Sequence, residues 1–502
     1  MIIEGMRAVL TSPTCLLWIL AGVFVGIVFG SIPGLSAAMA MVLFLPITFG
    51  MESVTGIATL IALYIGGISG GLISAILLKI PGTPASISTV FDGGPMADRG
   101  EAGRAIGVGI LYSFFGGLLS IAALIFIAPW LANFALKFTS FEYFSIAILS
   151  LTIIARLSEG SMINSLISGL LGVLISFIGM SPLGMLRFTF GNRYLMSGVS
   201  TVPLLIGLFA VGEIFKFSFT DKNKSLGEKK PYQLKGFGIS TKEFIEQLPN
   251  MIRSSILGIF IGILPGLGGS TAGLLAYSSA KSASKYPEKF GTGIIDGVIA
   301  SEAANNANIG GSLVPLLTLG IPGNTCAALL LSGLTIHKIT PGPLIFENSG
   351  VYVYAIFTAL IIANIFMLII ERAGIRVFVK LLDIPKYILF PIIIELCMVG
   401  AFADNNRPFD VLLIFIFGIS VFLLKKLGLQ STPFIIGYIL GPIAETNLVR
   451  AMSQSDGSIL PFFTRPISCV FLVITLLTIV SIIVKNMRSK PGEIREVLED
   501  ED

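Results

Sequence analysis

The sequence G-I-L-P-G-L occupies Gly262–Leu267, and I-P-G-N-T follows it at Ile321–Thr325. The first half of the chain carries the same pair of motifs, as G-S-I-P-G-L at Gly30–Leu35 and I-P-G-T-P at Ile80–Pro84. All four lie inside apolar sequence. A bilayer tolerates broken backbone only where protein or a water-filled cavity satisfies the freed polar groups, and paired breaks in two halves of a chain are typical of a transporter's binding site. The four Pro-Gly breaks therefore predict broken or re-entrant helices in two repeated halves.

The composition is that of a membrane protein. Of 502 residues, 54% are hydrophobic and 12% are charged, whereas a typical soluble domain carries about 25% charged residues. Apolar runs alternate with short polar segments along most of the chain. At about 20 residues for each span, the length predicts an all-α polytopic membrane protein of about 12 spans, with re-entrant or broken helices among them.

A charged segment divides the chain into two parts. We expect an N-terminal membrane repeat half at 1–219, a cytoplasmic linker at 220–250, a C-terminal membrane repeat half at 251–486 and a charged cytoplasmic tail at 487–502. Lysines and arginines cluster in the linker and the tail, which places both in the cytoplasm by the positive-inside rule. That sidedness requires an even number of crossings in the second half, whereas inverted repeats require an odd number in each half. Duplication is therefore predicted, while inversion stays open.

The helix breaks form the predicted substrate site. A broken helix leaves N–H groups free at the start of one piece and carbonyl groups free at the end of the other. The N–H groups suit a carboxylate, and the carbonyl groups suit Na⁺. The alternative is that the prolines and glycines only kink helices for packing. The predicted substrate-binding residues are Ser36, Thr83, Ser86, Ser270, Thr271, Asn324 and Thr325, together with the glycines Gly34, Gly82, Gly266 and Gly323.

A polar run inside apolar sequence forms the predicted ion-coupling site. Glu302, Asn305 and Asn306 share one face if this segment is helical, and Asn308 follows them. Polar side chains inside a membrane segment are costly, so a functional role is the default interpretation. The alternative is that the asparagines hold helices together by interhelical hydrogen bonds. These four residues and Asp92 are predicted to serve ion coupling, and a Na⁺ site is compatible with them.

Two other charged segments receive structural interpretations. Asp92-Gly93-Gly94-Pro95 has the composition of a turn. The alternative to an ion ligand at Asp92 is therefore a solvated loop, in which Asp98 pairs with Arg99. Glu371 and Arg372 are interpreted as the end of a span at an interface.

Several classes of function are excluded. The chain has no G-x-x-x-x-G-K-[ST] phosphate-binding motif, no H-E-x-x-H motif and a single histidine, His337. Its four cysteines are scattered and show no metal or disulfide spacing. We therefore expect no enzyme activity, no nucleic-acid partner and no cofactor other than co-transported Na⁺ or H⁺. A passive channel and a non-transporting scaffold subunit remain as alternatives to a carrier.

Several long motifs carry a family resemblance: Ile80–Pro84 with Asp92–Met96, Leu264–Ala272, Ala303–Ala307 with Gly310–Ser312, Leu319–Thr325, Pro341–Pro343, and Leu440–Pro442 with Arg465–Ser468. On these residues the chain resembles the large membrane subunit of the tripartite tricarboxylate transporter family over nearly its whole length. The resemblance implies a secondary active importer of organic carboxylates, of the tricarboxylate or dicarboxylate class, in the cytoplasmic membrane of a prokaryote.

The resemblance also implies partners and a mode of transport. Coupling to Na⁺ or H⁺ is expected, together with a small membrane subunit and an extracytoplasmic solute-binding protein that delivers the substrate. Contact with membrane lipid is expected, and a homo-oligomer is compatible with the sequence. An elevator-type motion of the two repeats is expected by analogy with other carriers that depend on binding proteins.

Overall fold

The computed structural model describes residues 1–157, 161–215, 239–382, 384 and 386–488 of the chain. Most of the predicted linker at 220–250 and nearly all of the predicted tail at 487–502 lie outside these residues. The last ten residues of the predicted linker belong to a helix, α11, which begins at Thr241. Its first turn is stabilised by a capping box, in which the Ser240 hydroxyl accepts from the Glu243 N–H and the Glu243 carboxylate accepts from the Ser240 N–H.

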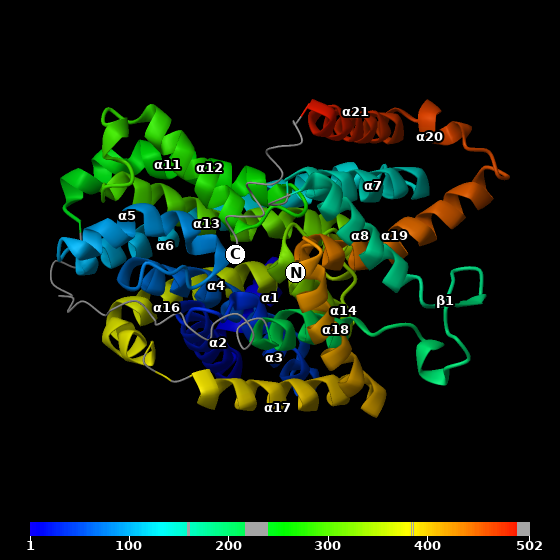
Figure 1. Ribbon diagram of the computed structural model, residues 1–502, viewed down its shortest axis with the longest axis horizontal. Helices are drawn as coiled ribbons and strands as arrows, with labels where there is room; N and C mark the ends of the chain where they lie inside the picture. The colour runs from blue at the N-terminus through cyan, green and yellow to red at the C-terminus, as the bar shows by residue number, and fades with distance from the viewer. Residues whose placement is uncertain (158–160, 216–238, 383, 385, 489–502) are drawn as a thin grey trace. The chain divides into compact units, whose positions relative to one another are not determined.

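The described residues form helices almost throughout, in two compact units (Figure 1). The larger unit comprises Met1–Lys137 and Ser200–Leu423, and the smaller unit comprises Phe138–Val199 and Leu424–Asp502. Each unit takes residues from both halves of the sequence, so the compact units differ from the predicted repeat halves. Whether those halves are repeats stays a prediction at this point.

The larger unit is all-helical. Its helices are separated by short turns, and several contain only one or two turns. They are α1 Ile2–Leu10, α2 Pro13–Ser31, α3 Ala37–Phe44, η1 Pro46–Gly50, α4 Ser53–Leu77, η2 Pro84–Ser86, α5 Ile87–Asp98, α6 Ala102–Ala135, α9 Thr201–Ile206, η4 Gly207–Val211, α11 Thr241–Ile263, α12 Gly269–Ala283, η5 Pro287–Lys289, α13 Ile295–Leu319, α14 Thr325–Ile336, α15 Ile345–Asn348, α16 Gly350–Leu381, α17 Lys386–Asn405 and most of α18 Pro408–Lys426.

The smaller unit consists of packed helices and a short hairpin. A close approach between α8 and α19 holds it together, because Gly169 and Gly437 meet backbone to backbone. Two ion pairs link other elements of this unit: Arg465 Nε donates to Glu142 Oε1 over 2.7 Å, and Arg187 lies 2.6 Å from Glu445. Its elements are α7 Ser140–Leu157, α8 Met162–Ser176, β1 Gly179–Met180, β2 Leu186–Arg187, η3 Arg193–Leu195, α19 Ser431–Gln454, α20 Leu460–Thr464 and α21 Pro466–Arg488.

All four Pro-Gly motifs lie between helices, as predicted. In the first half, α2 ends before Pro33-Gly34 and α4 ends before Pro81-Gly82. In the second half, α11 ends before Pro265-Gly266 and α13 ends before Pro322-Gly323. Proline lacks the N–H that would continue the helical ladder, which favours a helix end near these positions, and a left-handed Gly320 caps the end of α13.

Helix α13 is the centre of the larger unit. It packs against α6, α11 and α12, and every residue from Gly297 to Leu319 is buried. Glycines on the neighbouring helices allow this close packing, because a Cβ on Gly116 of α6 or on Gly258 of α11 would overlap the α13 backbone. Small residues at helix interfaces are typical of membrane proteins.

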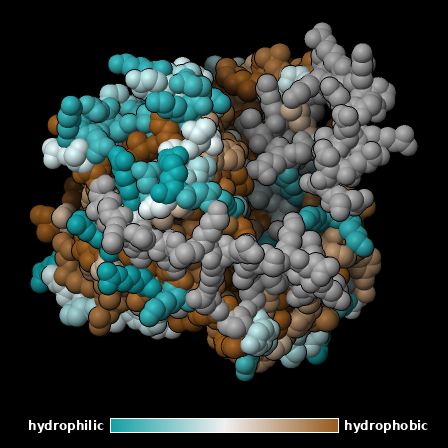
Figure 2. All heavy atoms as spheres, turned by 60° about the vertical axis from the view of Figure 1, so that its left-hand side comes forward, coloured by the Kyte–Doolittle hydropathy of each residue, from teal (hydrophilic) through white to brown (hydrophobic). Residues whose placement is uncertain are grey.

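Six described helices are long and apolar enough to cross a membrane, and the prediction of about 12 spans is not confirmed. These helices are Pro13–Ser31, Ser53–Leu77, Ala102–Ala135, Gly350–Lys380, Tyr387–Asn405 and Pro408–Lys426. In Figure 2, hydrophilic atoms gather at the upper left, and hydrophobic atoms predominate below them on the left flank. Exposed aromatic side chains, such as Phe126 and Trp130 on α6, match a lipid-facing surface.

The predicted turn at Asp92–Pro95 is wrong, because these residues lie within α5. Gly93 and Gly94 let α5 approach other parts of the chain: a Cβ on Gly93 would lie 2.7 Å from Ile76 of α4. The local turn preference is therefore overridden by packing against α4. The alternative interpretation, in which Asp98 pairs with Arg99, is wrong as well, since Lys79 pairs with Asp98 over 2.5 Å and Arg99 pairs with Glu101 over 3.1 Å.

Candidate functional site

The four breaks meet in the larger unit. Within each half, the glycine of the second break packs against the helix that leads into the first: a Cβ on Gly82 would overlap the Gly30 carbonyl oxygen, and one on Gly323 would overlap the Gly262 carbonyl oxygen. In the second half, the Gly266 N–H also donates to the Gly323 carbonyl over 2.8 Å. The halves join where a Cβ on Gly269 would lie 3.0 Å from the Ala85 side chain. We call this region the break cluster.

Three predicted substrate-binding side chains cap the helix ends that follow the breaks. The Ser36 hydroxyl accepts from the Met39 N–H over 3.1 Å and caps α3. The Asn324 Oδ1 accepts from the Ala327 N–H over 3.0 Å and caps α14. The Ser86 hydroxyl donates to the Thr83 carbonyl over 2.9 Å and stabilises η2. Their first structural role is therefore to satisfy backbone groups that the breaks set free.

The beginning of α12 lacks such a cap. Its N-cap residue is Gly268, which has no side chain to accept from the first-turn N–H groups. Ser270 and Thr271 lie half-buried in that first turn. The other predicted residues lie at their breaks with differing exposure: Gly34 is exposed, Gly266 and Thr325 are half-buried, and Gly82, Thr83 and Gly323 are buried.

Asn305 is a buried amide without a partner. Its side chain is 1% exposed, and neither Nδ2 nor Oδ1 has a hydrogen-bond partner among the described residues. It points at the start of α12, because a Cβ on Gly269 would overlap Oδ1. Buried polar groups without partners are costly, so such a group needs an explanation. A ligand that binds there would supply one.

Two other buried amide side chains, Asn324 and Asn308, form a continuous chain of hydrogen bonds. Asn324 Nδ2 donates to the Tyr64 hydroxyl over 2.7 Å and to Asn308 Oδ1 over 3.0 Å. The Tyr64 hydroxyl also lies 3.1 Å from the Ser312 hydroxyl. Asn308 Nδ2 donates to the Gly258 carbonyl over 3.4 Å. This chain ties α4, α11, α13 and α14 together.

Glu302 lies at the centre of a third polar group. Its two carboxylate oxygens accept from the Thr89 hydroxyl over 2.5 Å and from the Ser113 hydroxyl over 3.0 Å. Asn306 Nδ2 donates to the Ser113 hydroxyl over 2.8 Å, while Asn306 Oδ1 has no partner among the described residues. The segment is helical as predicted. However, Asn306 bonds to Ser113 on α6 whereas Asn305 faces α12, so the predicted common face is divided between two neighbours.

Both carboxylate oxygens of Asp92 accept hydrogen bonds from other residues of the chain. Its Oδ1 accepts from the N–H groups of Gly291, Gly293 and Ile294 over 2.7–3.0 Å, and its Oδ2 accepts from the Tyr277 hydroxyl over 2.9 Å. The side chain therefore satisfies the backbone that enters α13. Its role as an ion ligand stays a prediction.

Sequence reasoning missed Glu371. The interface interpretation is wrong for this residue, because its side chain is fully buried within α16 and accepts from the Ser69 hydroxyl over 2.9 Å. Its other oxygen, Oε1, has no partner among the described residues. The signal was present, since an acidic residue inside a long apolar helix is a candidate functional residue by default. Tyr64 was also missed, because a tyrosine in an apolar run is not distinguishable from an ordinary core residue.

Charge is distributed unevenly around the site. Neither Glu302 nor Glu371 pairs with a cationic side chain among the described residues. Basic residues lie farther out, as in the 2.5 Å pair between Arg104 and Glu243. The described residues contain no cluster of three or more His, Cys, Asp or Glu side chains that would hold a metal ion. A cation that binds here would therefore take hydroxyl, amide and carbonyl oxygens together with at most a few carboxylates.

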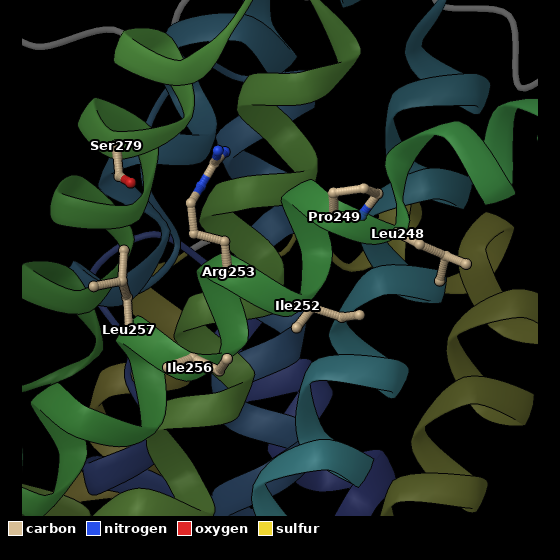
Figure 3. A pocket seen from close by; sticks show the side chains of 7 residues that line it. All are labelled: Leu248, Pro249, Ile252, Arg253, Ile256, Leu257 and Ser279. Carbon is tan, nitrogen blue, oxygen red and sulfur yellow. The ribbon is translucent and has the colours of Figure 1, made fainter.

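One surface cavity lies away from the break cluster. It has a volume of about 590 Å³, and α11 contributes most of its lining, with Ser279 of α12 opposite (Figure 3). Arg253 extends between these two helices in Figure 3 and donates to Asn250 Oδ1 over 2.8 Å. The remaining lining is apolar, and Ile256 is largely exposed. This cavity offers little polar chemistry for a carboxylate.

Comparison with known proteins identifies the family. A protein of Agrobacterium vitis, named an uncharacterized 52.8 kDa protein in the TAR-I ttuC' 3' region, is 36% identical over 491 residues, which are 98% of this chain and 97% of that protein. A second Agrobacterium vitis protein, named for the TAR-II ttuC' 3' region, is 37% identical over 237 residues, which are 47% of this chain and 98% of that protein. No solved structure matches the chain. The model of the tripartite tricarboxylate transporter TctA family matches residues 16–436, and the chain belongs to this family.

Proposed function

We propose that this chain is the large membrane subunit of a secondary active importer for organic carboxylates. Transport would be coupled to Na⁺ or H⁺ and fed by an extracytoplasmic solute-binding protein. The observation that carries this proposal is the break cluster, where four interrupted helices meet beside buried polar atoms that have no protein partner. Family membership and the six long apolar helices support a multi-pass membrane transporter subunit.

The chemistry of the break cluster suits a carboxylate together with a cation. Helix starts present N–H groups and positive partial charge to an anion. An uncompensated di- or trianion would be very costly to move through a low-dielectric interior, so a co-bound cation must offset part of its charge. Glu302 and Glu371 are buried carboxylates without a basic partner among the described residues, which makes them the candidates to hold Na⁺ or H⁺.

The proposal includes two structural repeats. The matching approaches of Gly82 to Gly30 and of Gly323 to Gly262 support this idea, because both pairs occupy the same positions relative to their Pro-Gly motifs. Carriers built from repeats commonly bind substrate where the repeats meet. An elevator-type movement of the broken helices would carry that site between the two sides of the membrane.

The proposal also includes partners and location. Family membership implies partner subunits, and we infer a small membrane subunit and a solute-binding protein that recognises the substrate first. We place the complex in the cytoplasmic membrane of a prokaryote. A homo-oligomer is compatible with this arrangement.

Uptake into proteoliposomes tests the function. The chain is reconstituted with its small membrane subunit, its binding protein is added outside, and labelled di- and tricarboxylates are supplied under Na⁺ or H⁺ gradients. The expected result is accumulation above the external concentration that needs both the gradient and the binding protein. Uptake that only equilibrates and ignores both gradients would support a channel instead. No carboxylate flux under any gradient would favour a scaffold subunit.

A further inference from the structure

The break cluster has two sides that are built from corresponding positions. Close helix contacts repeat at the same distances from the Pro-Gly motifs. A Cβ on Gly70 would lie 2.5 Å from the Ile27 carbonyl oxygen, and one on Gly311 would lie 2.5 Å from the Ile259 carbonyl oxygen. Counted from their prolines, Gly70 corresponds to Gly311 and Ile27 to Ile259. By the same count, Tyr64, Gly71, Thr83 and Ser36 correspond to Asn305, Ser312, Asn324 and Gly268.

One side is closed by its own side chains. There the Tyr64 hydroxyl contacts both Ser312 and Asn324, and all three side chains are buried. Asn324 caps α14, and Ser36 caps α3. The hydroxyl of Tyr64, the amide of Asn324 and the first turns of both helices are therefore occupied by protein groups.

The other side has a smaller residue at three of the four corresponding positions, and at the fourth it has a hydroxyl in place of an amide. Asn305 replaces tyrosine, Gly71 replaces serine, Thr83 replaces asparagine and Gly268 replaces serine. Both amide atoms of Asn305 have no partner among the described residues, and the buried Thr83 hydroxyl donates to none of them. Gly268 leaves the first turn of α12 without a side-chain cap. The second side therefore lacks the hydroxyl and amide groups whose hydrogen bonds fill the first side.

Two further hydroxyls extend this open side along α12. Ser88 is 1% exposed and Ser301 is fully buried, and neither hydroxyl has a partner among the described residues. Both lie beside Gly273 of α12, since a Cβ on Gly273 would lie 2.6 Å from Ser88 Oγ and 3.7 Å from the Ser301 carbonyl oxygen. Ser301 precedes Asn305 by one helical turn, so both belong to the same face of α13.

We propose that this open side is the subsite for one carboxylate group of the substrate, and that the Tyr64 side is its closed counterpart. The inference rests on the proposed transport function and assigns the site to one of the two repeats. The uncapped N–H groups of α12 and the Asn305 amide supply donors, and the hydroxyls of Thr83 and Ser88 add two more. The positive end of α12 favours an anion over a cation at this position.

Three variants of the reconstituted complex test the assignment, with citrate as a tricarboxylate probe. Asn305→Ala removes the buried donor. Gly268→Ser supplies the cap that Ser36 gives to α3, and it fits without a clash because no atom lies within 4 Å of a Cβ at this position. Tyr64→Phe removes the matching hydroxyl on the closed side. We expect the first two variants to raise the Kd for citrate about tenfold or more, since each weakens hydrogen bonds to a charged group, while Tyr64→Phe keeps the wild-type Kd.

The possible results distinguish a wrong assignment of the carboxylate subsite from a wrong assignment of the transport function. Thermal unfolding in detergent confirms that each variant is folded, and Gly268→Ser is expected to unfold at or above the wild-type temperature because serine is a good N-cap. If the wild type accumulates citrate but Tyr64→Phe loses binding while Asn305→Ala and Gly268→Ser keep it, the side assignment is overturned and the carrier function stands. If the wild type neither binds nor accumulates any di- or tricarboxylate, the proposed function itself is overturned.

Discussion

Glu302 is held as a buried carboxylate by hydroxyl groups alone. The hydroxyls of Thr89 and Ser113 donate to its two oxygens, and no cationic side chain among the described residues pairs with it. An unpaired buried charge is among the most costly features a protein contains, so we infer that a proton or a bound cation neutralises this group. Glu371 lies near enough to interact with Glu302 electrostatically, which adds to that cost.

Replacing Glu302 by glutamine should uncouple transport without unfolding the protein. Glu302→Gln keeps the size of the side chain but removes the charge that a coupling ion would neutralise. We expect gradient-driven accumulation of carboxylate to fall about tenfold or more, since each 1.4 kcal/mol of lost coupling is about a factor of ten. The thermal unfolding temperature should stay the same or rise, because a neutral amide costs less to bury. Glu347→Gln, at an exposed carboxylate on α15, is the matched control. Wild-type accumulation by Glu302→Gln would remove this residue from the coupling site.

The lowered pKa of Glu243, at the start of α11, predicts that the stability of the folded protein depends on pH. Hydrogen bonds from the Ser240 backbone and hydroxyl, followed by the charge of Arg104, lower the pKa of Glu243 below its ordinary value of 4.5. A lowered folded-state pKa means that the stabilising contribution is complete above the unfolded pKa and is lost as the pH falls through the folded pKa. Glu243→Gln should therefore lower the unfolding temperature near neutral pH, and this difference should shrink as the pH falls below 4.5.

Thermal unfolding in detergent over a pH series measures that difference. The effect should be small, within about 1 kcal/mol, because the side chain is partly exposed and solvent screens it. A temperature difference that stays constant or grows toward acid pH would show that the Glu243 carboxylate does not stabilise the folded state.

At the scale of helices, close contacts at the breaks hold the half-helices in place. Gly323 stands where α13 gives way to α14, and a Cβ there would overlap the Gly262 carbonyl and lie 2.8 Å from the Ser312 Cα. These are backbone atoms, so the contact has no easy way to relax. Gly323→Ala should therefore destabilise the protein by about 1–3 kcal/mol, as overpacking does in other close-packed interiors.

Gly50→Ala is the matched control for this element. No atom lies within 4 Å of a Cβ at Gly50, so its effect should stay within about 0.5 kcal/mol, as for ordinary surface substitutions. Unfolding midpoints of the two variants in the same detergent give the comparison. Equal midpoints for Gly323→Ala and the wild type would contradict the close approach of the two breaks.

The ends of the helices at the breaks were predictable from the sequence, while other elements were not. The prolines at 33, 81, 265 and 322 each follow a helix end and lack the N–H that would continue it, although Pro95 and Pro315 lie inside α5 and α13, so proline alone does not fix a break. The Asp92–Pro95 turn was predicted from equally local preferences, yet it is helical because its glycines let α5 pack against α4. Local preferences for turns are therefore weak against close helix contacts, and even the missing N–H of Pro95 does not end α5.

The candidate site was predictable in its composition but not in its connections. The polar run at Ser301–Ser312 was recognisable because polar groups are rare inside apolar sequence. That Asn305 lacks a partner while Asn308 has one depends on which helix faces each amide, and sequence spacing does not fix the facing helices. Glu371 was missed because α16 continues well past the point where the sequence suggested the end of a span.

At the scale of the whole molecule, the sequence halves and the compact units divide the chain at different places. The halves 1–219 and 251–486 are defined by repeated motifs, but the larger unit takes its helices from both of them. All four breaks and all three buried polar groups lie within this unit. Substrate and coupling ion would therefore bind within one compact body, which is the arrangement that direct coupling between two ligands requires.

Binding of carboxylate and coupling ion should therefore be mutually dependent. If the two ligands share α13, through Asn305 for the carboxylate and Glu302 for the cation, each stabilises the arrangement that the other needs. By linkage, a saturating coupling ion should lower the Kd for the carboxylate by the same factor by which the carboxylate lowers the Kd for the ion, typically about 5–150-fold. Titration calorimetry on the purified membrane subunits, with Na⁺ exchanged for K⁺ in one series and pH varied in another, identifies the ion and measures both factors. A carboxylate Kd that responds to neither Na⁺ nor pH would mean that the two ligands do not share a site, and the coupling role of Glu302 would fall with it.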